Sequence, residues 1–118
     1  VLAQLHNSDQ LVVTHDGVDP DWSRQWAHDP RVVILHSSTR RGVARSLDAA
    51  INATESTFVA RMDADDVSLP GRLKAQSDYL LANPDVVVVS GQAQRIDHRG
   101  NYLGRMRLPA GERIRHEL

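Results

Sequence analysis

The sequence predicts an α/β fold built on a mainly parallel sheet. Two observations carry this prediction: short runs of β-branched and apolar residues are bounded by turn signals, and segments with the apolar spacing of a helix lie between them. Strands that alternate with helices are typical of a parallel sheet covered by helices. The length of 118 residues suits a single hydrophobic core, so we expect one folding unit over residues 1–118.

Two valine-rich runs, 11–14 and 32–35, predict the first two strands. Both are mostly apolar and bounded by turn-forming residues, so we expect both strands to be buried. Between them, Trp22 and Trp26 lie four residues apart, which predicts a short helix with its two indoles packed on the sheet.

The middle of the chain predicts a helix, a strand and a second helix. Residues 43–51 place apolar side chains on one helical face, and residues 57–60 form a third strand-like run that ends at an acidic cluster. The second helix is expected to have Ser68 as its N-cap and Pro70 in its first turn. It should end before Pro84, because proline cannot continue a helix.

The last third of the chain predicts a further strand and a hairpin. The four valines at 86–89 are typical of a central strand that is covered on both faces. Segments 94–97 and 102–107 flank a short polar turn and predict the hairpin. Residues 112–118 resemble the start of a helix without a stop signal, and the first residue is not methionine. We therefore expect the chain to be part of a longer protein.

Composition excludes several classes of function. Lys and Arg number 14 against 15 Asp and Glu, so no overall charge excess would hold the chain on nucleic acid. The absence of cysteine excludes disulfide frameworks and thiolate zinc sites. No apolar run reaches the roughly 20 residues of a membrane helix, and no signal peptide opens the chain, so we expect a soluble domain.

Acidic residues follow two of the predicted strands. Ligands of parallel α/β sheets bind beyond the carboxyl ends of the strands, which selects Asp16 after the first strand and the acidic segment, residues 63–66, after the third. The Asp-x-Asp spacing lets alternate carboxylates face one ligand, and oxygen donors suit Mg²⁺ or Mn²⁺. Aspartate-rich turns are also common on protein surfaces and at helix caps, so the residues alone leave a purely structural role open.

Five ordered motifs resemble those of family 2 glycosyltransferases, which have the GT-A fold. They are VLAQ at 1–4 for S-V-L-x-Q, LVVTHDGV at 11–18 for V-V-D-D-G-S, RG at 41–42 with SLDAA at 46–50 for N-x-G and A-L-N-x-A, FVARMDADD at 58–66 for the strand with D-x-D, and SLPGRL at 68–73 with Gln76 for the bacterial S-x-P-x-R-L-x-x-Q. The resemblance implies a GT-A-like (Rossmann-like), mainly parallel sheet flanked by helices, with a C-terminal hairpin, as an incomplete domain.

By this resemblance, four residues form the nucleotide site: Asp16, Gly17, Arg41 and Asp63. Asp16 would contact the base or the ribose of the donor, and Asp63 would lie against the ribose. Arg41, near a helix start, is placed to approach the phosphates, although an exposed arginine is more often solvated surface. His15 stands where the family has its first Asp, which places it in a turn that faces the ligand.

The metal site implied by the resemblance consists of Asp65, Asp63 and Asp66. Asp65 would coordinate Mn²⁺ or Mg²⁺ directly. Asp66 would either join the metal shell through water or cap the segment that follows, and the sequence leaves both roles open. Nearby, we expect Arg61 to pair with a carboxylate and Arg72 to hold the acidic segment in shape.

The resemblance also implies the reaction, an inverting transfer from a nucleotide-diphosphate sugar, above all a UDP-sugar, in the synthesis of cell-surface polysaccharide or glycoconjugate. The acceptor would be a glycan or a lipid-linked glycan. The enzyme would work in the cytoplasm, and association with the inner face of the membrane is left open. Its catalytic base, which deprotonates the acceptor hydroxyl, is expected beyond Leu118, so the isolated chain should not complete the transfer. The alternative is a non-catalytic or degenerate, metal-dependent nucleotide-binding module.

Overall fold

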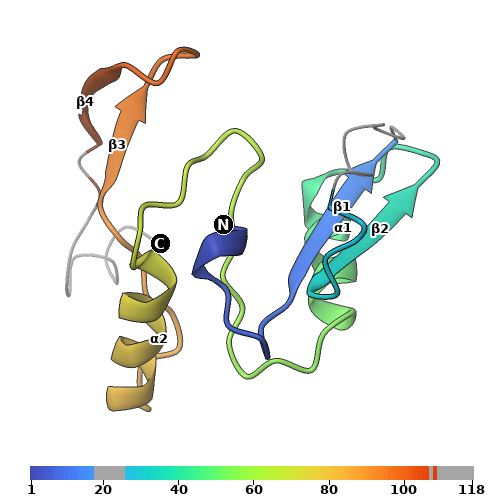
Figure 1. Cartoon of the computed structure of the whole chain (residues 1–118), viewed down its shortest axis with the longest axis horizontal. Helices are drawn as coiled ribbons and strands as arrows, with labels where there is room; N and C mark the ends of the chain where they lie inside the picture. The colour runs from blue at the N-terminus through green and yellow to red at the C-terminus, as the bar shows by residue number, and fades with distance from the viewer. Residues whose placement is uncertain (18–25, 107, 109–118) are drawn as a thin grey trace. The chain divides into compact units, whose positions relative to one another are not determined.

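The computed structural model describes residues 1–17, 26–106 and 108 (Figure 1). They fall into two compact units, Val1–Leu73 and Lys74–Leu118. The elements in chain order are the 3₁₀ turn η1 (Leu2–Gln4), β1 (Leu11–Asp16), β2 (Val32–Ser37), α1 (Val43–Asn52), α2 (Arg72–Ala82), β3 (Ala93–Ile96) and β4 (Tyr102–Met106). The expected helix around Trp22 and the helix start at 112–118 lie outside the described residues, and a single domain over 1–118 stays a prediction.

In the first unit, β1 and β2 form the parallel pair that the sequence predicts. Leu11 lies opposite Val32, and the register continues without a break to Asp16 opposite Ser37. Each strand runs two residues beyond its apolar run, because the hydrogen-bond ladder continues until the N–H of Gly17 donates to the Ser37 carbonyl at 2.9 Å. Side-chain propensity therefore marks the middle of a strand, and backbone pairing decides where it ends.

Helix α1 follows β2 and packs against β1, so that it covers one face of the pair (Figure 1). The predicted helix is confirmed, and it begins after Gly42, whose φ of 86° turns the chain into the first helical residue. Within the predicted apolar face, Leu47 and Ala50 are half-buried, whereas Val43 and Ile51 near the two ends are exposed. The middle of α1 is therefore its buried part.

The predicted third strand at 57–60 is wrong. These residues are irregular, and Phe58 and Val59 are exposed. A strand needs a neighbour that satisfies its N–H and C=O groups, and within the described residues the parallel sheet consists of β1 and β2 alone. The acidic segment therefore does not follow a strand, and its predicted place beyond the carboxyl end of a third strand is wrong.

The second helix begins later than predicted. Helix α2 starts at Arg72, beyond both Ser68 and Pro70. Gly71 explains the shift, because its φ of 79° lies in the left-handed region, which a right-handed helix excludes. The helix ends before Pro84, as predicted.

In the second unit, β3 and β4 form the predicted antiparallel hairpin. Asp97 shapes its turn, because its carboxylate accepts the N–H groups of Arg99 and Asn101, each at 2.8 Å. The backbone of Gly100 adopts a φ of 82° in the same turn. These local contacts explain why the hairpin could be predicted from a short stretch of sequence.

The predicted central strand at 86–89 is wrong. Its residues are irregular, and the side chains of Val87 and Val88 are 90% and 79% exposed. In the described part of the second unit, β3 and β4 pair only with each other. An apolar run becomes a strand only where another strand pairs with it, and valine content cannot supply that partner.

The α/β class, the parallel pair and the hairpin are thus confirmed. Among the described residues no apolar side chain is fully buried, and the residues of β1 and β2 are half-buried, apart from His15, which is buried, and His36, which is exposed. No helix in the described part of the chain is both long and apolar enough to span a bilayer. The pair of strands and α1 form the frame on which the predicted nucleotide-site residues are placed.

Candidate functional site

The turn after β1 joins two distant parts of the chain. Asp16, the last residue of β1, accepts the backbone N–H of Arg41 at 2.6 Å and that of Gly42 at 2.8 Å. The N–H of Arg41 is the main reason why the pKa of the Asp16 carboxyl lies below its usual value, and the N–H of Gly42 and the charges of Arg40 and Arg41 lower it further. Asp16 thereby fixes the end of β1 against the start of α1.

Gly17 permits this close approach. Its φ of 84° lies in the left-handed region, and a Cβ atom there would be 2.7 Å from Cγ and 3.0 Å from the backbone nitrogen of Arg40. Any larger residue would need both a strained backbone and a shift of the Arg40 segment. Three of the four predicted nucleotide-site residues, Asp16, Gly17 and Arg41, are therefore brought together at this turn, called the Asp16 turn below.

Arg40 and Arg41 add positive charge to the Asp16 turn. Both side chains are exposed, and within the described part of the chain neither guanidinium forms a hydrogen bond or an ion pair. Guanidinium groups suit phosphate oxygens because they donate in a planar fork. The turn therefore combines a bonded carboxylate with two cationic groups that remain available to an anion.

Two arginines shape the acidic segment, as the sequence predicts. Arg61 forms an ion pair with Asp63, with 2.7 Å between Nη2 and Oδ1, and both side chains are about half exposed, at 57% and 52%. Arg72 donates from its Nη2 to the Arg61 carbonyl at 2.9 Å. The N–H of Asp66 donates to the Asp63 carbonyl at 3.1 Å, which closes a turn. The segment thus has a defined backbone and one neutralised carboxylate.

Asp65 and Asp66 carry the remaining two carboxylates of the acidic segment. Both are exposed, and within the described residues neither side chain forms a hydrogen bond or an ion pair. Such oxygen donors fit a hard divalent ion. The described part of the chain nevertheless holds no cluster of three or more acidic or histidine groups that could bind a metal, and Asp63 is engaged by Arg61. An ion here would take further oxygens from a ligand or from water.

The prediction for His15 is wrong. His15 lies inside β1, opposite His36, and is only 7% exposed. It does not occupy a turn that faces a ligand, because the strand continues to Asp16. Its position in the motif suggested a ligand contact, and the backbone ladder places it in the sheet instead.

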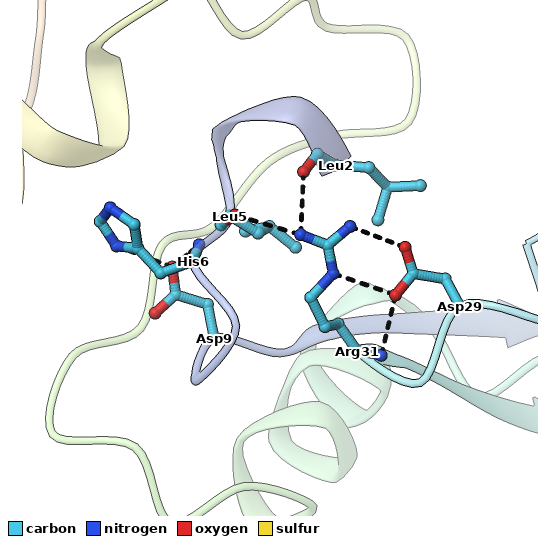
Figure 2. Close-up of polar contacts among 6 residues, drawn as sticks. All are labelled: Leu2, Leu5, His6, Asp9, Asp29 and Arg31. Carbon is cyan, nitrogen blue, oxygen red and sulfur yellow. Dashed lines mark hydrogen bonds and ion pairs between the residues drawn. The ribbon is translucent and has the colours of Figure 1, made fainter.

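Sequence reasoning missed a cluster around Arg31 (Figure 2). Arg31 binds Asp29 with both ends of its fork, Nε to Oδ1 at 3.0 Å and Nη2 to Oδ2 at 2.7 Å. This pairing, first of all the side-chain hydrogen bond, lowers the pKa of Asp29 to about 2. Nη1 donates to the carbonyls of Leu5 at 3.1 Å and Leu2 at 3.4 Å. The Asp-x-Arg spacing could have indicated the ion pair, but no sequence signal indicates the carbonyl acceptors.

Comparison with known proteins identifies the family of the chain. Residues 1–117 match the family model for Glycosyl transferase family 2. The Amylovoran biosynthesis glycosyltransferase AmsE of Erwinia amylovora is 30% identical over 101 residues, which cover 82% of this chain and 38% of that protein. The O-antigen biosynthesis glycosyltransferase WbnJ of Escherichia coli is 29% identical over 119 residues, or 97% of this chain and 46% of that protein. The chain therefore spans less than half the length of these relatives. No solved structure matches it.

Proposed function

The chain belongs to glycosyl transferase family 2, and we propose that it is the part of a glycosyltransferase that binds the nucleotide-diphosphate sugar. The proposed donor is a UDP-sugar. Family membership over residues 1–117 is the observation that carries this proposal. It supports an α/β frame that is part of a GT-A domain, and in this proposal the Asp16 turn and the acidic segment share one ligand.

In this proposal the Asp16 turn meets the nucleoside and the phosphates. Both carboxylate oxygens of Asp16 accept backbone N–H groups, but each keeps a second lone pair for a donor on the base or the ribose. Gly17 keeps the turn tight, and the exposed guanidinium of Arg41 is available to a phosphate. Asp63, at the start of the acidic segment, would lie against the ribose.

The proposed metal ligands are Asp65, Asp63 and Asp66, and the proposed ion is Mn²⁺ or Mg²⁺. Within the described residues the carboxylates of Asp65 and Asp66 are exposed and unpaired, and Asp63 becomes a third oxygen ligand when it leaves Arg61. The bound ion supplies positive charge that offsets the diphosphate and the leaving group. Without a cation, the diphosphate would be repelled by the carboxylates of the acidic segment.

The names of the Erwinia amylovora and Escherichia coli relatives refer to amylovoran and O-antigen biosynthesis. We therefore place the whole protein in the synthesis of a cell-surface polysaccharide or glycoconjugate. The proposed reaction is an inverting transfer to a glycan or a lipid-linked glycan on the cytoplasmic side of the membrane. A transfer assay on the whole protein, with product stereochemistry, separates this role from that of a nucleotide-binding module without activity.

Calorimetric titration of the chain with UDP, with and without Mn²⁺, tests the binding proposal. We expect Mn²⁺ to strengthen UDP binding by the wild-type chain. In Asp65→Asn the increase in affinity caused by Mn²⁺ should be smaller by about tenfold or more, as is usual for disrupted metal sites. The matched control is Asp85→Asn, which removes the same charge from an exposed position outside the acidic segment. Equal metal dependence in both variants would remove Asp65 from the site.

A further inference from the structure

A side chain from the N-terminal turn reaches the backbone just beyond the acidic segment. Gln4 donates from its Nε2 to the carbonyl of Ser68 at 3.0 Å, across 64 residues of chain. The other polar atom of the same amide, Oε1, is enclosed and accepts no hydrogen bond within the described residues. The amide nitrogen therefore carries the whole polar interaction of this side chain.

The turn that carries Gln4 is itself anchored. Arg31 donates to the carbonyls of Leu2 and Leu5, which flank Gln4 on both sides, while Asp29 binds the far side of its guanidinium (Figure 2). An arginine whose three side-chain nitrogens all donate, to a bidentate carboxylate and to two carbonyls, has little rotational freedom left. Gln4 thus projects from a fixed point and not from a loose end of the chain.

The acidic segment lies between two such attachments. On one side, the carbonyl of Arg61 accepts from Arg72 at 2.9 Å. On the other side, the carbonyl of Ser68 accepts from Gln4. Neighbouring carboxylates repel one another and favour conformations that separate them, so a backbone held at both ends limits how far Asp65 and Asp66 can move apart.

We propose that Gln4 is a positioning residue for the acidic segment: its hydrogen bond to Ser68 fixes the backbone after Asp66 and so presents Asp65 and Asp66 to the ion and the diphosphate. This inference rests on the proposed function of the segment. Gln4 touches neither ion nor donor. It acts by reducing the ordering that binding would otherwise require, which is the general basis of preorganised sites.

Gln4→Glu tests the proposal with the smallest change of shape. The substitution replaces the donating nitrogen by an oxygen, which then faces the Ser68 carbonyl oxygen. The matched control is Gln10→Glu, which adds the same charge at an exposed residue of the same unit whose side chain makes no hydrogen bond within the described residues. Calorimetry with UDP and Mn²⁺ measures affinity, and hydrogen exchange measures protection of the Asp66 amide, which donates to the Asp63 carbonyl.

We expect Gln4→Glu to weaken Mn²⁺-dependent UDP binding about fivefold, which is the order of one hydrogen bond, and to speed exchange of the Asp66 amide. Gln10→Glu should match the wild type in both measurements. The proposal is overturned if Gln4→Glu binds and exchanges like the wild type, or if both variants weaken binding equally. Should Gln4→Glu fail to fold, Gln4→Leu removes the donor without adding charge.

The two measurements also separate this inference from the proposed function. If the wild-type chain shows no metal-dependent UDP binding, the proposed function fails, and positioning of a binding segment fails with it. Faster exchange of the Asp66 amide in Gln4→Glu would in that case show the attachment to be structural only. If the wild type binds and Gln4→Glu binds equally well, the proposed function stands and the role of Gln4 is overturned.

Discussion

The Asp16 turn and the acidic segment both present aspartates, but the two regions use them in opposite ways. Both oxygens of Asp16 are occupied by backbone N–H groups of Arg41 and Gly42. The carboxylates of Asp65 and Asp66 have no partner within the described residues and are exposed. A carboxylate whose two oxygens each accept an N–H group of its own chain organises structure and keeps one lone pair per oxygen for a ligand, whereas a carboxylate that is left unpaired in a shaped loop offers all of its lone pairs.

The Asp16 turn and the acidic segment are also held in place in different ways. The Asp16 turn is fixed from within, by a carboxylate that bonds two successive N–H groups and by a glycine packed against Arg40. The acidic segment is fixed from outside, by Arg72 and Gln4 acting on backbone carbonyls at its two ends. Its own carboxylates stay accessible as a result, apart from that of Asp63.

We expect the largest effect on the free energy of unfolding from substitution of a glycine, and each region offers one. Gly17 and Gly71 both have a positive φ, but a Cβ at Gly17 would collide with Arg40, whereas a Cβ at Gly71 meets nothing within 4 Å. We expect Gly17→Ala to reduce the free energy of unfolding by roughly 2–4 kcal/mol and Gly71→Ala by roughly 1–2 kcal/mol, the cost of the backbone conformation alone. Urea denaturation measures both, and equal losses would contradict the close packing of the Asp16 turn.

A second comparison exchanges one aspartate in each region for asparagine. Asp16→Asn directs an amide NH₂ toward a backbone N–H, so we expect a clear loss of stability. Asp65→Asn should change the free energy of unfolding by less than about 0.5 kcal/mol, as is usual for exposed positions without partners. Thermal unfolding of both variants provides the measurement. A more damaging Asp65→Asn would mean that the acidic segment is structural.

The dependence of stability on pH tests Asp29, a second carboxylate whose two oxygens both accept hydrogen bonds within the chain. The pKa of Asp29 is lowered from 3.8 to about 2, chiefly by its side-chain hydrogen bond with Arg31. Since the unfolded state binds the proton more readily, the contribution of Asp29 is complete above its ordinary pKa and is lost as pH falls from about 4 to about 2. In Arg31→Lys the free energy of unfolding should change less steeply with pH across this range, because the ammonium group of lysine cannot form the fork. An unchanged dependence on pH would mean that the Asp29–Arg31 ion pair does not contribute to stability.

A similarly small effect on stability is expected for Arg61, whose ion pair with Asp63 is half exposed. Arg61→Gln should change the free energy of unfolding by at most about 0.5 kcal/mol, as for other exposed ion pairs. The same substitution releases Asp63, so Mn²⁺-dependent UDP binding should strengthen. Lys74→Gln, which breaks the exposed Lys74–Asp78 pair, is the control and should leave binding unchanged. Weaker binding by Arg61→Gln would indicate that Arg61 itself contacts the donor.

The parts of the fold that the sequence predicts correctly depend on local signals. The hairpin follows from its turn residues around Asp97, and α1 follows from its apolar spacing. The parallel pair follows from two valine-rich runs, which form strands that pair with each other. The runs at 57–60 and 86–89 have similar composition but no pairing strand among the described residues, and pairing over a distance is not encoded in a short window.

The candidate site shows the same division. The motifs selected Asp16, Gly17 and Arg41, which the structure brings to one turn. The position of Arg61 just before the acidic segment allowed its pairing with a carboxylate to be expected, and the structure identifies that carboxylate as Asp63. The contact of Gln4 with Ser68 spans 64 residues, so no local pattern could predict it. His15 was misplaced because its position in the family motif suggested a turn, whereas the strand pairing continues through His15 to Asp16.

The ratio of UDP affinities with and without Mn²⁺, measured in Asp65→Asn and Asp16→Asn, tests the division of roles most directly. We expect Asp65→Asn to lose most of this ratio and to unfold at the temperature of the wild type. Asp16→Asn should keep the ratio while its stability and its overall affinity for UDP decrease. A wild-type ratio in Asp65→Asn, or loss of the ratio in a folded Asp16→Asn, would overturn this division of roles.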